Sequence, residues 1–349
     1  MSNISYKYNS KFLRSAFLIV LICFLLPNIP VNSQTQQFSQ FYAAPLYLAP
    51  SFAGATDGSR VALNYRNQWP ELPGTFATFA FSFDHYFDEY NSGVGVMLFR
   101  DQAGSVNLST TNAGFLYSYN IKINRDWSLR PGLHFLYSQR TIDYGNFVFG
   151  DQLNLDGNYS GSRTSVSVDK VDFFDASSSL VAYRQPLWMG VSFDHLMTPN
   201  QSITAEEFNI PLKTSIFGGY RFHFGNALFG GADESASVTF LYKNQGSFNQ
   251  LDIGAYWTKE PISLGLIYRG IPVFKNPAYG NYIQDAVVTM LAIRTQDIRV
   301  GYSYDFTISN LLGATGGSHE ISIIYEFNQE QTRRRRDPCV YPCTYSPYD

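Results

Sequence analysis

The sequence predicts an all-β fold: a transmembrane antiparallel β-barrel of about 14 strands in a bacterial outer membrane. Three observations predict it. Between residues 59 and 327, short segments alternate apolar and polar residues, and each ends at a turn of Gly, Asn, Asp or Pro. A secretory leader precedes them, and no second apolar helix follows. The 25 Tyr and 29 Phe, against only 15% charged residues, are typical of a lipid-facing band with aromatic girdles.

Residues 1–33 have the pattern of a signal peptide. A basic region is followed by an apolar core too short to span a bilayer, and then by small residues at the cleavage positions. These are Lys7, Lys11 and Arg14, then residues 16–26, then residues 31–33. We therefore expect the mature chain to begin at Gln34.

The mature chain is mildly acidic. Removing the three leader cations from the 25 Lys and Arg leaves 22, against 28 Asp and Glu, so the net charge is −6. This balance disfavours nucleic acid as a partner. The lipid-facing aromatic band makes outer-membrane lipid the expected surroundings. No linker divides residues 59–328, so they are expected to form one barrel.

Each predicted strand has an apolar face and a polar face, because successive side chains of a strand point to opposite sides. Phe79, Phe81 and Phe83, for example, alternate with smaller or polar residues such as Ser82 and Asp84. The predicted strands are 59–67, 75–86, 92–101, 108–122, 126–139, 176–184, 187–195, 212–223, 235–243, 248–258, 261–270, 284–294, 297–306 and 318–327.

An even strand count places both chain ends on one side, which in bacterial barrels is the periplasm. The connections then divide into long external ones and short periplasmic ones, with 224–234 as a longer exception. The longest connection, 140–175, is either a surface excursion or an element folded over a pore mouth.

Charged residues of both signs are predicted to face the lumen. This set fits two arrangements. The charges could form an internal salt-bridge network that blocks the lumen, or they could line a selective pore. Its members are Arg130, Arg221, Arg269, Arg294, Arg299, Asp84, Asp194, Asp252, Asp305 and Glu326.

Nothing in the sequence indicates an enzyme, a cofactor or a metal site. The neighbours Asp84 and His85, and likewise Asp194 and His195, fall on opposite faces of their strands. Neither a Gly-x-Ser-x-Gly nor a His-Glu-x-x-His motif occurs. Hydrolysis is therefore not predicted.

Residues 34–58 lie outside the strand count and are expected to form a periplasmic or plug segment. They look neither helical nor transmembrane, and Pro45 and Pro50 are expected to hold them extended. Their apolar side chains should pack in the barrel or against a partner. The residues concerned are Phe38, Phe41, Tyr42, Leu46, Tyr47, Leu48 and Phe52.

Residues 329–349 are expected to form a basic periplasmic tail. Arg333, Arg334, Arg335 and Arg336 could be a solvated run, or could reach an acidic partner or anionic lipid. An oxidising periplasm would allow Cys339 and Cys343 to pair.

Two motifs carry a family resemblance. Residues 37–54, QFSQFYAAPLYLAPSFAG, and residues 64–70, NYRNQWP, together resemble the PorP/SprF family of the type IX secretion system of the Bacteroidota. The resemblance implies a non-enzymatic outer-membrane component that binds secretion partners or cargo and supports export of surface proteins or gliding adhesins. The apolar residues of 34–58, with Pro45, Pro50 and the four arginines, are the predicted partner-binding residues. The alternative is a porin or transporter for small or hydrophobic solutes.

Overall fold

The computed structural model describes residues 35–56, 58–104, 108–142, 170–203, 207–224, 234–275, 282–309 and 315–327. All of them belong to one compact unit, Gln34–Asp349. No helix in these ranges is long and apolar enough to cross a membrane.

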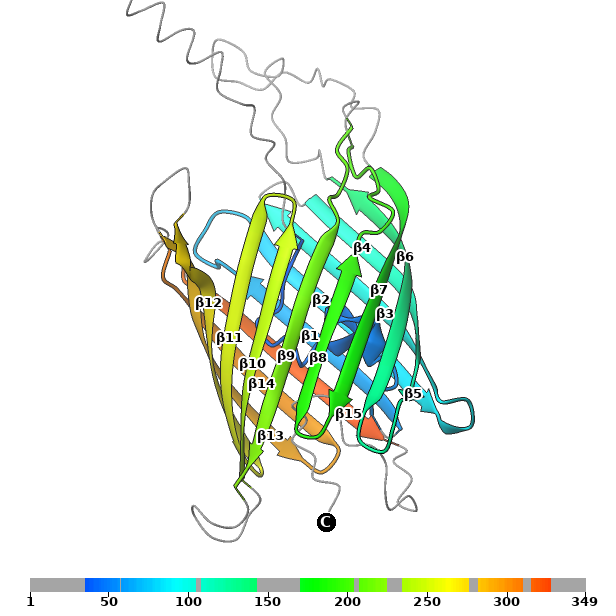
Figure 1. The fold of residues 1–349 in the computed structure, drawn as a ribbon. Helices are drawn as coiled ribbons and strands as arrows, with labels where there is room; N and C mark the ends of the chain where they lie inside the picture. The colour runs from blue at the N-terminus through cyan, green and yellow to red at the C-terminus, as the bar shows by residue number, and fades with distance from the viewer. Residues whose placement is uncertain are drawn as a thin grey trace, which may run out of the picture. The chain divides into compact units, whose positions relative to one another are not determined.

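The described strands form one antiparallel sheet that closes on itself as a barrel (Figure 1). Strand β4 pairs with β3 on one side and with β6 on the other, which closes the wall. The two-residue strand β5 continues β4 along β6, so the wall has 14 strands. The strands are β1 (Ser59–Gln68), β2 (Thr75–Phe87), β3 (Ser92–Gly104), β4 (Leu108–Tyr119), β5 (Ile121–Lys122), β6 (Ser128–Thr141), β7 (Lys170–Arg184), β8 (Leu187–Asp194), β9 (Lys213–His223), β10 (Glu234–Gln245), β11 (Phe248–Lys259), β12 (Ile262–Lys275), β13 (Tyr282–Thr295), β14 (Ile298–Thr307) and β15 (Ser318–Phe327).

The predicted apolar outer face is confirmed, and polar or small side chains face inward over part of the wall. On β2, Phe79 is exposed while Ala80, Ser82 and Asp84 are buried in the interior. On β6, Phe135 is exposed and His134 is buried. Large apolar side chains therefore cover the outer surface, as a lipid-facing barrel requires.

The largest difference from the predicted strand boundaries is at the start of β7. Strand β7 begins at Lys170, six residues before the expected start at 176. The alternation continues through this acidic stretch, since Phe174 is exposed and its ring lies 5.3 Å from that of Tyr137, while Asp175 is buried. The predicted loop 140–175 is shorter as a result, and residues 143–169 of it lie outside the described residues.

The two ends of the barrel differ. Ser59 and Phe327 pair directly at one end, as an even strand count requires. The tight turn at Gln185 and Pro186 is at the same end, which we call the turn end. The opposite end, where the β10–β11 hairpin turns at residues 246–247, is called the loop end.

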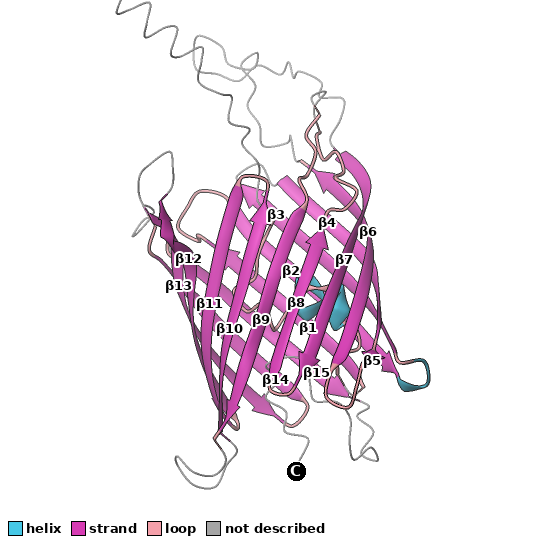
Figure 2. Cartoon of the chain, in the orientation of Figure 1, coloured by secondary structure: helices cyan, strands magenta, loops and turns pink. Residues whose placement is uncertain are grey.

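Residues 35–56, called the lumen segment, run inside the barrel (Figure 2). Thr35 bonds to Gln245 at the loop end, whereas Gly54 bonds to Asp84 near the turn end. The described chain therefore starts at the end opposite to Ser59 and Phe327, because this segment runs the length of the lumen before β1 begins. Both termini had been expected on one side.

The lumen segment contains two short helical turns. Helix α2 (Pro45–Leu48) and the 3-10 helix η1 (Pro50–Phe52) each begin at a proline. The expectation of an extended stretch was wrong, because the fixed φ of proline also suits the first position of a helix.

Candidate functional site: the lumen and its segment

The lumen wall carries a large apolar patch that the lumen segment covers. Phe41, Tyr42, Leu46, Leu48 and Phe52 pack into one buried cluster with inward-facing side chains of the wall. Burying a side chain of this size contributes roughly 1.5–3 kcal/mol. The wall members include Met97, Leu116, Val181, Tyr183, Trp188, Phe217, Leu241, Tyr256, Ile267, Val288 and Met290.

Aromatic rings make specific contacts within this patch. The centroids of Tyr42 and Tyr256 lie 5.0 Å apart in an edge-to-face arrangement. The ring centroids of Phe52 and Phe217 lie 5.8 Å apart. Such pairs add stabilisation beyond their buried area.

Sequence reasoning missed the apolar wall, because it expected inward residues to be polar or small. The available signal was a break in the alternation. Leu187, Trp188 and Met189 are consecutive apolar residues, and the middle one points inward.

Two glycines let the lumen segment approach the wall closely. A Cβ at Gly132 on β6 would lie 2.3 Å from the backbone nitrogen of Ser51. One at Gly93 on β3 would lie 2.0 Å from the carbonyl oxygen of Ala53. The wall is therefore shaped for the backbone of this segment.

A buried ion pair holds the segment near the turn end. Arg60 pairs with Asp84 at 2.9 Å and also donates to the carbonyl oxygen of Phe52 at 3.0 Å. Asp84 in turn accepts from the backbone N–H of Gly54 at 2.8 Å. The pair thus bonds to both sides of the turn that leads into β1.

A larger ionic network holds the segment in the loop-end half. Glu320 accepts from the backbone N–H groups of Ser39, at 2.7 Å, and Gln40, at 3.0 Å. Arg66 bridges Glu320, at 3.2 Å, and Asp305, at 2.8 Å. Buried carboxylates require such partners, because each ion loses its hydration.

Arg269 extends the network to a second acidic group. It pairs with Asp305 at 3.0 Å and with Asp252 at 3.4 Å. It also donates to the hydroxyl of Ser39 at 2.8 Å, and that hydroxyl donates to Asp305 at 2.7 Å. One serine of the segment therefore bonds to several charged groups of the wall.

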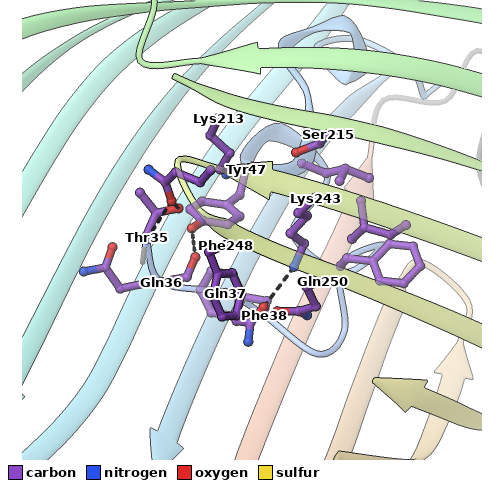
Figure 3. Close-up of a pocket in the computed structure, with 14 residues that line it drawn as sticks. Thr35, Gln36, Gln37, Phe38, Tyr47, Lys213, Ser215, Lys243, Phe248 and Gln250 are labelled. Atoms are coloured by element: carbon purple, nitrogen blue, oxygen red, sulfur yellow. Dashed lines mark hydrogen bonds between the residues drawn. The ribbon is translucent and has the colours of Figure 1, made fainter. Parts of the chain in front are cut away.

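A cavity of about 40 Å³ remains beside the segment at the loop end, enough for a few water molecules (Figure 3). Lys243 donates to Gln37 across it at 3.0 Å. Lys213 lies 5.4 Å from the centroid of the Tyr47 ring and pairs with Asp194 at 3.1 Å. The hydroxyl of Tyr47 donates to the carbonyl oxygen of Gln36.

The structure places the predicted lumen charges at inward positions. Six are buried and four are partly buried. The buried ones are Arg130, Asp84, Asp252, Arg269, Asp305 and Glu326, and the others are Arg221, Arg294, Arg299 and Asp194.

Two of the histidines bond to neighbouring side chains. His195 Nδ1 lies 2.6 Å from a carboxylate oxygen of Asp175 on β7, a contact that the sequence did not predict. His85 bonds to the hydroxyl of Ser59 at 2.9 Å. Among the described residues, no cluster of three His, Cys, Asp or Glu could hold a metal ion.

The predicted partner-binding residues fall into two groups. The apolar ones, with Pro45 and Pro50, lie in the lumen, where all are buried except the half-buried Tyr47. The arginines Arg333, Arg334, Arg335 and Arg336 lie outside the described residues, as do Cys339 and Cys343.

Comparison with known proteins gives one family and a set of barrels. The family model described as type IX secretion system membrane protein PorP/SprF matches residues 31–325. No curated protein sequence matches significantly.

Solved structures with a similar fold are outer-membrane proteins of low identity. Omp33 of Acinetobacter baumannii is 9% identical, with 77% of this chain and 99% of that chain covered and a TM-score of 0.44. The toluene transporter TodX of P. putida is 11% identical, with 80% and 92% covered and a TM-score of 0.46.

Proposed function

Because the chain belongs to the PorP/SprF family of type IX secretion system membrane proteins, we propose that it binds secretion partners or cargo and so supports export of surface proteins or gliding adhesins. It is an outer-membrane component of that system, and the family is not a known enzyme family. Binding of secretion partners or cargo is the proposed role within that system.

The observation that carries the proposal is the occupied lumen. The lumen segment is held by the Arg60–Asp84 pair near the turn end and by the Glu320 network in the loop-end half. Removing one partner of a buried ion pair typically costs about 3–5 kcal/mol, so such pairs favour a fixed segment. A filled barrel cannot offer a wide path for solutes, and its outer ends remain as surfaces for other proteins.

The same observation disfavours the alternative of a porin or transporter. A conducting barrel of this size needs a lumen that side chains do not fill. Here the apolar wall patch faces the segment rather than water.

The test is a strain that lacks the gene, complemented with wild-type protein or with a version carrying an affinity tag in an exposed turn. We expect loss of secreted adhesins and surface motility in the deletion strain, and recovery with either protein. Tagged protein should co-purify secretion components or cargo from native membranes. Unchanged secretion and motility in the deletion strain would remove the proposal.

A further inference from the structure

Arg130 is a buried cation that pairs with no carboxylate of the described residues. It is the third residue of β6, near the turn end, and it is 4% exposed. Its Nε and Nη1 atoms have no hydrogen-bond partner in the part of the chain that the structure describes. Within the described ranges no acidic residue forms an ion pair with it, whereas Arg60, Arg66 and Arg269 each have a carboxylate oxygen within 3.0 Å.

The groups around Arg130 are aromatic rings and donors. Its guanidinium carbon lies 5.3 Å from the centroid of the Tyr86 ring. Ile121 pairs with Leu129 and Ser118 with Gly132, so Asn120 lies directly opposite Arg130 on the neighbouring strand. The carbonyl oxygen of the Asn120 side chain already accepts from Tyr183, at 2.9 Å, which leaves its amide N–H groups as further donors.

The turn end of the lumen is also positive as a whole. Near the strand ends there, the inward-facing described residues include five arginines and two carboxylates. An excess of one sign of charge attracts ions of the opposite sign. These residues are Arg60, Arg130, Arg221, Arg294 and Arg299, with Asp84 and Glu326.

We propose that Arg130 is the centre of a binding site for a carboxylate, carried by a peptide segment that enters from the turn end. A planar guanidinium matches a planar carboxylate in shape and charge. A single unpaired cation beside an aromatic ring suits a monoanion, and buried charges in proteins are normally paired. This site deepens the proposed function, because it names the chemical group that a partner would present. It rests on that function in one respect: the peptide would belong to a secretion partner or to cargo.

The test measures binding of a fluorescent hexaglutamate peptide to the full-length protein purified in detergent, with hexaglutamine as the uncharged probe. We expect the wild-type protein to bind hexaglutamate but not hexaglutamine. The R130Q variant should bind hexaglutamate at least tenfold more weakly than wild type does. N120D should weaken binding to a similar degree, because it supplies a carboxylate opposite Arg130. R184Q is the matched control, since Arg184 is at the same end but is exposed and paired with Asp126 at 3.6 Å.

Heat-modifiable migration on gels shows that each variant is folded. If R130Q does not fold, N120D decides the question, because it keeps the arginine. Wild-type affinity in folded N120D, or equal binding of the two peptides, would overturn the site. Displacement of hexaglutamate by inorganic phosphate but not by acetate would overturn the carboxylate assignment. The peptide assay measures binding to purified protein and does not depend on secretion. The proposed function is tested separately, by secretion and motility in the deletion strain.

Discussion

The backbone N–H of Ser39 donates to a carboxylate oxygen of Glu320 at 2.7 Å, although the two residues are 281 positions apart in the chain. Both are fully buried. The bond joins the start of the lumen segment to the last strand of the wall. Arg66 bonds both to Glu320, at 3.2 Å, and to the hydroxyl of Ser39, at 2.6 Å, so the carboxylate and the arginine hold the same point of the segment.

The first prediction concerns this carboxylate. In E320A, the backbone N–H groups of Ser39 and Gln40 lose their acceptor and Arg66 loses one of its two carboxylates. Unpairing a buried ion of this kind costs about 3–5 kcal/mol. We expect a clearly lower unfolding temperature, measured by heat-modifiable migration. E207A is the control, because Glu207 is exposed; an equal effect in both variants would contradict the assigned role.

The second prediction concerns Gly132. In G132A the new methyl group meets the backbone of Ser51, which cannot rotate away. We expect faster amide hydrogen exchange in residues 49–53, followed by mass spectrometry, because the segment is displaced from the wall. G114A is the control: its methyl group meets the side chain of His134, so exchange in 49–53 should stay at the wild-type rate. Slow exchange in G132A would show that the wall can adjust.

The wall of the barrel could be predicted from the sequence because alternation is a local property. Phe79 and Ala80 reveal their faces through their immediate neighbours alone. The interior could not be predicted in the same way. Nothing near Glu320 indicates that it meets Ser39, and the apolar run around Trp188 indicates an apolar inward position without indicating which segment covers it. Those contacts depend on which segment fills the barrel, which is a non-local property of the fold.

The third prediction tests the outer surface. Phe135 is 59% exposed at the middle of β6, where a lipid-facing side chain would meet hydrocarbon. An arginine at the bilayer midplane costs about 2–4 kcal/mol. We expect F135R to shift the urea midpoint for unfolding from lipid vesicles to lower concentration, while F135L stays close to wild type. An unchanged midpoint in F135R would mean that this face does not meet lipid.

The last prediction concerns conductance. A barrel of 14 strands is wider than the eight-stranded kind that side chains alone can fill, so removal of the lumen segment should open a path for ions. We expect wild-type protein to be silent in planar bilayers, and a variant lacking residues 35–56 to conduct. The folded state of the deletion variant is checked by its migration on gels before and after heating. E320A keeps the whole segment and removes one of its anchors, so it should conduct rarely or briefly. Steady conductance by the wild-type protein would support the porin alternative, because a segment fixed in the lumen would prevent a steady ion current.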